Sequence, residues 1–168
     1  TLNMADLATR LPQVSGRTIS VAFAFLAVGI SLKLALWPLP QWLPDAYAYA
    51  PSTVTAFLAS TATKVAVYVL LRVFFSVFGL AFTFEAMTVR WILLPLALIA
   101  VLSSSLTAIY QGNVKRLLAY SSVAQIGYMI LGVGLASVTG LTAGILHLFN
   151  HALIKAALFM AMGAVMYQ

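Results

Sequence analysis

Long apolar runs separated by short polar connections occupy most of the chain, and this pattern predicts helices that span a membrane. A helix needs about 20 consecutive apolar residues to cross the hydrocarbon core of a bilayer. Five runs are long enough: residues 18–37, 53–71, 91–110, 117–136 and 141–167. The apolar stretch at residues 73–84 is expected to prolong the second helix. The remaining connections are too short for a soluble domain, so we expect an all-α integral membrane protein with five transmembrane helices.

The first 17 residues differ in character from residues 18–168, which form the predicted transmembrane helical domain. Their apolar side chains fall on one face of a short helix that Pro12 and Gly16 would end; these are Leu2, Met4, Leu7 and Leu11. We therefore predict that residues 1–17 lie at the membrane interface. The chain starts at Thr1 without a signal-peptide pattern, so we expect an internal piece of a longer protein or part of a subunit.

The composition supports the membrane interpretation. Hydrophobic residues make up 63% of the 168 residues and charged residues 7%, with a mean hydropathy of +1.05, which a soluble domain could not carry on its surface. Nine basic against three acidic residues give a formal net charge of +6, which indicates basic loops facing an anionic leaflet. No cluster of Arg and Lys with interleaved aromatic residues lies on a polar face. The expected partner is therefore the lipid bilayer and not nucleic acid.

Three titratable side chains interrupt the last apolar run and share one helical face. His147, His151 and Lys155 follow one another at intervals of four residues, so they spread over about 80° of the helix and rise about 12 Å along it. Titratable groups are costly inside a membrane and commonly mark an ion or proton path. The three residues are therefore candidate proton carriers. The alternative is that this polar face only joins the helix to its neighbours.

A group of prolines follows a lysine at the end of the first run. Lys33 precedes Pro38, Pro40 and Pro44, and prolines remove backbone donors and stop a regular helix. Irregular backbone inside a membrane is tolerated where it is buried or lines a wet cavity. We therefore predict that the first helix is broken at Pro38 and Pro40 and that Lys33 belongs to an ion site. The alternative is a loop at the interface, with Lys33 extending outward to water.

Lys64 lies near the middle of the second run, where its side chain is too deep to reach the interface easily. We expect this side chain to face protein or water and to carry a proton. Thr61, Thr63 and Tyr68 flank it. The polar side chains of the third and fourth runs are uncharged, and ordinary hydrogen bonds between helices explain them; these are Ser103, Thr107, Tyr110, Ser121, Gln125 and Tyr128.

Several familiar sites are missing from the sequence. It contains neither a phosphate-binding glycine loop nor a nucleophile elbow. His147 and His151 lack the glutamate of the H-E-x-x-H zinc motif, and Lys155 on the same face would repel a metal ion. We therefore expect no cofactor and no metal. No carboxylate lies inside any of the five runs, which is unusual for a complete proton pathway.

Three stretches resemble the antiporter-like, proton-translocating subunits of respiratory complex I, of Mrp-type multisubunit sodium/proton antiporters and of membrane-bound hydrogenases. The stretches are SLKLALWPLPQWLPDAYAYAPSTVTAFLASTATKVAVYVLLR, QGNVKRLLAYSSVAQIGYMILG and HLFNHALIKAALFMAMG. They occur in the same order as in the family and cover nearly the whole chain. Leu58 stands where the largest antiporter-like subunit of complex I has a histidine. This difference, with the WLPDAYAYAPS run, makes the chain more similar to the D-type subunit of Mrp antiporters.

The resemblance implies a subunit of about fourteen transmembrane helices in two inverted repeats, of which this chain supplies the middle part, helices seven to eleven. It implies that Lys33 is the lysine of the broken seventh helix and Lys64 a relay lysine on the next helix. His147, His151 and Lys155 would form the central relay. The family's glutamate on helix five and its titratable residue on helix twelve would lie outside this chain, which accounts for the missing carboxylate.

We therefore expect an ion-translocating subunit that works with other membrane subunits in a bacterial or archaeal cell membrane. It would move protons, either in exchange for Na⁺ in an Mrp-type complex or driven by redox chemistry elsewhere in a complex I-like assembly, and the sequence leaves both open. The alternative is a structural subunit that only scaffolds its neighbours. An enzyme acting inside the bilayer has the least support, because no nucleophile with an adjacent base is visible. The resemblance places the loop with Lys115 and Arg116 in the cytoplasm, whereas the count of basic residues favours the opposite side.

Overall fold

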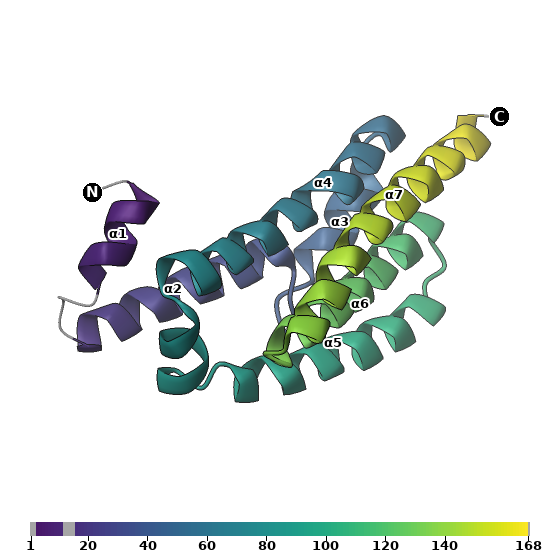
Figure 1. The fold of residues 1–168 in the computed structure, drawn as a ribbon. Helices are drawn as coiled ribbons and strands as arrows, with labels where there is room; N and C mark the ends of the chain where they lie inside the picture. Colours follow the sequence, from purple (N-terminus) through teal and green to yellow (C-terminus); the bar gives the residue numbers. More distant parts are fainter. Residues whose placement is uncertain (1–2, 12–15, 168) are drawn as a thin grey trace.

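The computed structural model describes residues 3–11 and 16–167. The helices of this part of the chain are α1 (Met4–Arg10), α2 (Gly16–Leu34), α3 (Trp42–Tyr49), α4 (Ser52–Leu71), η2 (Arg72–Val77), η3 (Ala81–Ala86), α5 (Arg90–Ile109), α6 (Val114–Gly134) and α7 (Val138–Tyr167). No strand occurs within these ranges, and five helices are long and apolar enough to cross a membrane: α2, α4 with η2, α5, α6 and α7 (Figure 1). The prediction of an all-α membrane protein with five transmembrane helices is confirmed.

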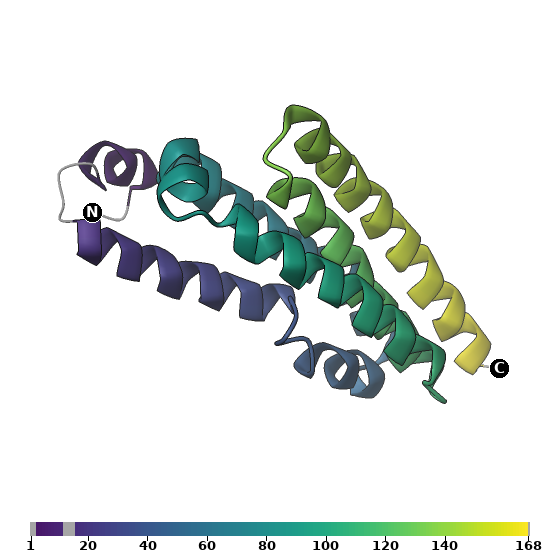
Figure 2. The same cartoon turned by 90° about the horizontal axis from the view of Figure 1, so that it is seen from below.

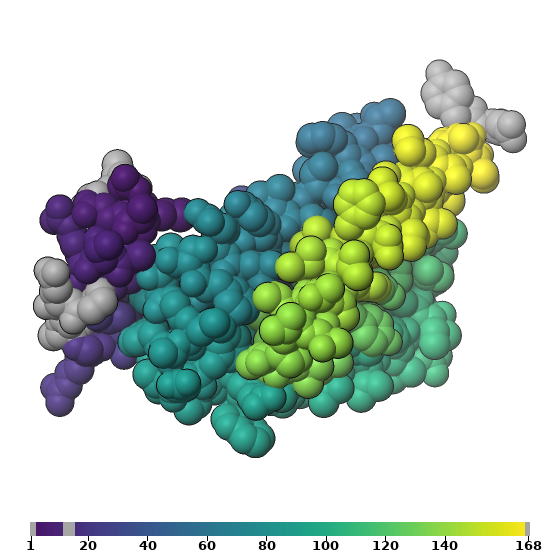
Figure 3. Space-filling model, in the orientation of Figure 1, coloured from purple at the N-terminus to yellow at the C-terminus, as the bar shows by residue number. Residues whose placement is uncertain are grey.

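The helix α6 lies at the centre of the bundle. It packs along α5 on one side and against α7 on the other, and the short helix α3 also contacts it (Figures 1 and 2). The helix α4 packs against both α2 and α7. In their most apolar segments, 61% of the residues of α6 are buried, against 17% in α2 and in α7. Figure 3 shows α7 on the outside of the molecule, and large apolar side chains such as Phe149 and Leu153 are exposed on it.

The first transmembrane helix ends earlier than its apolar run predicts. The helix α2 stops at Leu34, and Ala35 takes a left-handed conformation with a φ of +59°. Residues 35–41, which we call the break segment, form an irregular connection that contains Pro38 and Pro40. The helix therefore does not continue through the prolines, and the chain resumes helical structure only in α3.

The second transmembrane helix continues beyond the predicted residue 71. The helix α4 passes directly into the wider π-helical turn η2, so the span extends from Ser52 to Val77. Gly79 then has a φ of +81°, a left-handed conformation that favours glycine, and the chain turns into η3. The prediction that residues 73–84 prolong this helix is wrong beyond Val77. The Thr83 hydroxyl donates a hydrogen bond to the Phe74 carbonyl oxygen at 3.0 Å, which fixes the returning segment.

The helices α6 and α7 cross at a point where a side chain would not fit. A Cβ atom at Gly132 would lie 2.6 Å from the carbonyl oxygen of Gly140, and one at Gly140 would lie 2.7 Å from the carbonyl oxygen of Gly132. Gly144, one turn further along α7, also faces Gly132. Glycines spaced by four residues let membrane helices approach closely. The crossing places the first half of α7 directly on α6.

The N-terminal segment is only partly described. The helix α1 covers residues 4–10, and Leu2 and Pro12 lie outside the described residues. Gly16 is the first residue of α2 and does not end the preceding helix, which stops at Arg10. The assignment of residues 1–17 to the membrane interface stays a prediction.

Candidate functional site

The titratable residues of α7 face the interior of the bundle. His151 and Lys155 are each 3% exposed, and His147 is half-buried. The rings of His147 and His151 are nearly parallel, with an interplanar angle of 9° and 6.2 Å between their centroids. The spacing of four residues produces this arrangement, because it returns each side chain to the same face one turn further on.

Lys155 is held by neutral acceptors on α6. Its Nζ donates hydrogen bonds to the carbonyl oxygen of Leu118 at 2.7 Å and to the hydroxyl oxygen of Ser121 at 2.5 Å. No carboxylate pairs with it in the described part of the chain. An ammonium group buried with only neutral partners keeps a large part of its desolvation penalty.

Lys64 approaches the same place from α4. The side chain is 6% exposed, and its Nζ donates a hydrogen bond to the carbonyl oxygen of Ala59 on its own helix. Lys64 and Lys155 both lie within electrostatic range of His151, and also of each other. The helices α4 and α7 therefore bring together Lys64, His147, His151 and Lys155, which we call the basic cluster.

Several buried polar atoms around the basic cluster have no hydrogen-bond partner among the described residues. They are both ring nitrogens of His151, Nε2 of His147 and Oγ1 of Thr63. Buried polar groups are nearly always satisfied, and ordered water commonly supplies the missing bonds. A neutral imidazole offers one donor and one acceptor nitrogen, so such a ring can pass a proton between water molecules on its two sides.

One end of the basic cluster opens to a hollow between α6 and α7. The ring of Tyr128 meets that of His147 edge-on, with 6.1 Å between centroids. His147, Tyr128 and Gln125 line a hollow of about 480 Å³ together with the glycines of the helix crossing. Tyr128 and Gln125, which the sequence indicated only as helix-joining residues, therefore lie at the mouth of the cluster.

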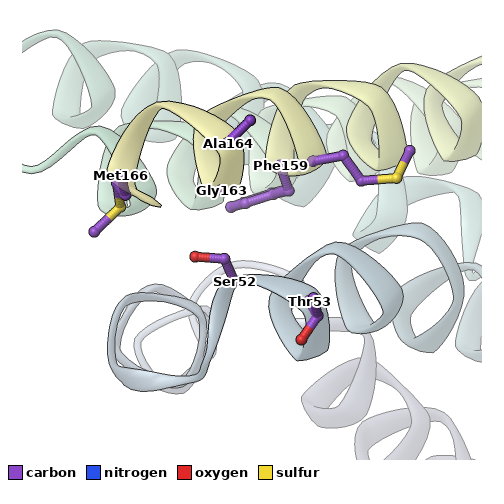
Figure 4. A pocket seen from close by; sticks show the side chains of 7 residues that line it. Ser52, Thr53, Phe159, Gly163, Ala164 and Met166 are labelled. Atoms are coloured by element: carbon purple, nitrogen blue, oxygen red, sulfur yellow. The ribbon is translucent and has the colours of Figure 1, made fainter. Parts of the chain in front are cut away.

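A second hollow lies at the other end of α7. A groove of about 780 Å³ runs between the first turn of α4 and the last turns of α7. Figure 4 shows Ser52 on α4 facing Gly163 on α7 across this groove, with Phe159 further along its wall. Phe159 lies one turn after Lys155, so it separates the groove from the basic cluster.

The structure does not bring Lys33 to the basic cluster. Lys33 lies in the last turn of α2 with an exposed side chain, and within the described residues it makes no hydrogen bond or ion pair. The left-handed turn at Ala35 ends the helix directly after it. Of the sequence-predicted carriers, Lys64, His151 and Lys155 are gathered at one place with His147, and Lys33 stands apart beside the break segment.

Sequence reasoning missed the basic residues that hold α3 in place. The fourth apolar run predicts a helix from residue 117, but α6 starts at Val114, because Asn113 caps it by accepting a hydrogen bond from the Lys115 backbone N–H at 2.9 Å. Lys115 is buried, and its Nζ donates to the carbonyl oxygen of Ala50 at 3.0 Å, at the end of α3. An asparagine two residues before the charged pair is the signal for this helix start.

A salt bridge adds to this contact. Nη2 of Arg116 lies 2.6 Å from Oδ1 of Asp45, on the first turn of α3. The indole Nε1 of Trp42 also donates to the carbonyl oxygen of Leu32 at 2.9 Å. The short helix after the break segment is therefore fixed to α2 at its start and to α6 along its length.

The chain has five membrane-capable helices and a buried cluster of lysine and histidine. No acidic residue pairs with this cluster in the described residues. These features define a polytopic membrane protein with a candidate proton path. All of residues 1–168 match the family described as NADH:quinone oxidoreductase/Mrp antiporter, TM, and the chain belongs to this family.

Relatives of known identity agree with this assignment. NADH-quinone oxidoreductase subunit N of Desulforudis audaxviator is 41% identical over 170 residues, covering 99% of this chain and 33% of the relative. The D-type subunit of the Na(+)/H(+) antiporter of Alkalihalophilus pseudofirmus is 34% identical over 166 residues, covering 98% and 33%. A chain of the Mrp complex from Dietzia sp. DQ12-45-1b superimposes with a TM-score of 0.86 at 32% identity, covering 98% and 30%. The chain thus spans about a third of the length of the relatives it matches, and the family resemblance seen in the sequence is confirmed.

Proposed function

We propose that this chain is the central part of a proton-translocating membrane subunit and that the basic cluster carries the protons. The observation that supports this most strongly is the convergence of Lys64, His151 and Lys155 from two helices into one buried place without a carboxylate among the described residues. Structural ion pairs would require an acidic partner, and helix-joining polar residues are normally uncharged. Titratable groups that exchange a proton fit both features.

In this proposal the proton travels along α7. Lys155 releases its proton toward His151, which lies about 6 Å lower on the same helix face, one turn away. His151 passes a proton on through its unpaired nitrogens to His147, whose ring is stacked below it. His147 then leads to the hollow lined by Tyr128 and Gln125. Lys64 supplies the cluster from the side of α4.

Lys33 and the prolines form a second part of the proposal. Irregular backbone at membrane depth fits a water-lined entry, and Lys33 lies directly before the break segment that contains Pro38 and Pro40. We assign Lys33 as a further proton carrier that acts together with groups outside this chain. Other membrane subunits would cover the apolar surface left open on α2 and α7.

Two driving reactions are compatible with the proposed proton transport. One relative is named as a Na(+)/H(+) antiporter subunit and another as an NADH-quinone oxidoreductase subunit. Exchange for Na⁺ in an Mrp-type complex and coupling to redox chemistry elsewhere in a complex are both consistent with a cluster that handles only protons. Flux that depends on a Na⁺ gradient would select the first, and flux that depends on quinone reduction would select the second.

The test is proton flux through the full-length subunit, assembled with its complex and reconstituted in liposomes. Lys64→Ala and His151→Gln should reduce flux to background while assembly is preserved, because each removes a titratable group and His151→Gln keeps hydrogen-bonding atoms. Arg72→Ala is the control, because it removes an exposed basic side chain at the end of the same helix as Lys64. Wild-type flux in both Lys64→Ala and His151→Gln would instead favour the alternative function, a scaffold for neighbouring subunits. Lys33→Ala is expected to lose flux as well, and normal flux in it would confine the relay to the basic cluster.

A further inference from the structure

A buried tyrosine of α3 reaches the helix that carries Lys64. Tyr47 is 1% exposed, and its hydroxyl donates a hydrogen bond to the carbonyl oxygen of Leu58 on α4 at 3.3 Å. The next carbonyl oxygen along α4, that of Ala59, accepts the hydrogen bond from Lys64 Nζ. Consecutive carbonyl groups of one helix therefore receive the tyrosine hydroxyl and the lysine ammonium.

Thr63 lies between these two groups. Its side chain is 1% exposed, its hydroxyl lies beside that of Tyr47, and it directly precedes Lys64 in α4. The Thr63 Oγ1 has no hydrogen-bond partner of good geometry among the described residues. The Tyr47 hydroxyl is its polar neighbour, and a water molecule held there would give the Thr63 hydroxyl the hydrogen bond that a buried polar group needs.

Phe159 on α7 packs against Tyr47. Its ring meets Tyr47 edge-on, with 5.6 Å between centroids and an interplanar angle of 86°. Phe159 continues the stripe of His151 and Lys155 at the same spacing of four residues, and it also lines the groove between α4 and α7 (Figure 4). Tyr47 is therefore separated from the groove by one aromatic ring.

We propose that the hydroxyls of Thr63 and Tyr47 are positioning groups that hold water beside Lys64 and so extend the proton path toward α3. This inference rests on the proposed function of Lys64. When the Lys64 ammonium releases a proton, one N–H bond breaks and one O–H bond forms on the held water, which leaves a neutral amine and a hydronium ion. That hydronium ion passes its extra proton to the next water and returns to neutral. Without the hydroxyls the acceptor water has no fixed place, so proton release from Lys64 slows.

The decisive variant is Thr63→Val in the full-length subunit within its complex. Valine has nearly the shape of threonine, and the Tyr47 hydroxyl keeps its hydrogen bond to the carbonyl oxygen of Leu58, so a purely structural role predicts unchanged flux and little change in thermal stability. The proposal instead predicts at least about a tenfold loss of proton flux with assembly intact. This loss is smaller than that expected for a group that itself transfers the proton, because the hydroxyl acts through water. Thr63→Ser restores the hydroxyl and should restore flux.

Thr61→Val is the matched control, because it makes the same change two residues away in the same helix. Thr61 lies on the other side of α4, where its hydroxyl donates to the carbonyl oxygen of Phe57 at 2.8 Å. Wild-type flux in Thr61→Val with loss in Thr63→Val supports the proposal. Equal loss in both variants overturns it, because a general effect on α4 would then explain the result.

Tyr47→Phe tests the second hydroxyl, because it keeps the ring contact with Phe159 and removes only the oxygen. It should lower flux in the same direction as Thr63→Val, and wild-type flux in both variants overturns the proposal. If Tyr47→Phe fails to assemble, the Thr63→Val result alone decides. Lys64→Ala distinguishes this inference from the function on which it rests. Normal flux in Lys64→Ala refutes the role proposed for Lys64, whereas loss of flux in Lys64→Ala with normal flux in Thr63→Val and Tyr47→Phe refutes only this inference.

Discussion

Replacing Lys155 by methionine is expected to abolish proton transport without lowering stability. The change removes two hydrogen bonds donated by the ammonium group, each of which contributes about 1.5–3 kcal/mol when one partner is charged. It also removes the desolvation penalty of a buried charge, which is several kcal/mol, and apolar replacement of buried ionic groups is often neutral or stabilising by about 1–4 kcal/mol. The stability lost with the two hydrogen bonds is therefore nearly offset by the stability gained when the desolvation penalty is removed.

The acceptors on α6 strengthen this expectation. The carbonyl oxygen of Leu118 also accepts hydrogen bonds from the hydroxyls of Ser121 at 2.9 Å and Ser122 at 3.0 Å, so it is not left unpaired when Lys155 is removed. Ser121→Ala is the contrasting variant. It keeps the charge but removes one acceptor of the Lys155 ammonium, so we expect it to lower stability by about 1–3 kcal/mol.

Thermal unfolding of the detergent-solubilised complex and proton flux in liposomes together test this reasoning. Lys155→Met should unfold at or above the wild-type temperature and show background flux, whereas Ser121→Ala should unfold at a lower temperature. A Lys155→Met protein that unfolds well below Ser121→Ala and still transports normally would show that Lys155 is a structural residue. The proposed proton transfer from Lys155 to His151 would then be wrong.

Two further predictions concern the contacts that position the basic cluster. Gly132→Ala should lower thermal stability and assembly, because its Cβ atom would lie 2.6 Å from the backbone oxygen of Gly140, whereas Gly29→Ala, with nothing within 4 Å, should behave as wild type in the same unfolding assay. Lys115→Met should loosen α3, because it removes the bond to the carbonyl oxygen of Ala50, and proteolysis of the connection between α3 and α4 should become faster; an unchanged cleavage rate would count against the role given to Lys115.

The sequence predicts the parts of this structure that depend on local spacing. Apolar runs of about 20 residues are sufficient to identify the five spans, because the thickness of the bilayer sets that length. The shared face of His147, His151 and Lys155 likewise follows from the helical repeat alone. The burial of Lys64 follows from its depth in the second run.

Other parts depend on contacts between distant residues. Ala35 ends α2 ahead of the prolines by adopting a left-handed conformation, which is uncommon for alanine and which an apolar run does not indicate. Tyr47 meets Leu58 and Phe159 only after α3 has packed on α4 and α7, so its sequence position gives no sign of a place beside Lys64.

A long part of α7 extends beyond its close contact with α6 at Gly132, Gly140 and Gly144, so a small rotation at this contact would move the other end of α7 further. Gly144 and Lys155 are eleven residues apart, which corresponds to about 16 Å along α7. If α7 pivots at the crossing, a rotation of about 5° moves the far end by about 1.4 Å, enough to stretch a contact of ordinary length beyond hydrogen-bonding range. The 2.5 Å contact between Lys155 and Ser121 lies at that far end. A small tilt of α7 about the glycine crossing would therefore be enough to break the contact that holds the Lys155 ammonium.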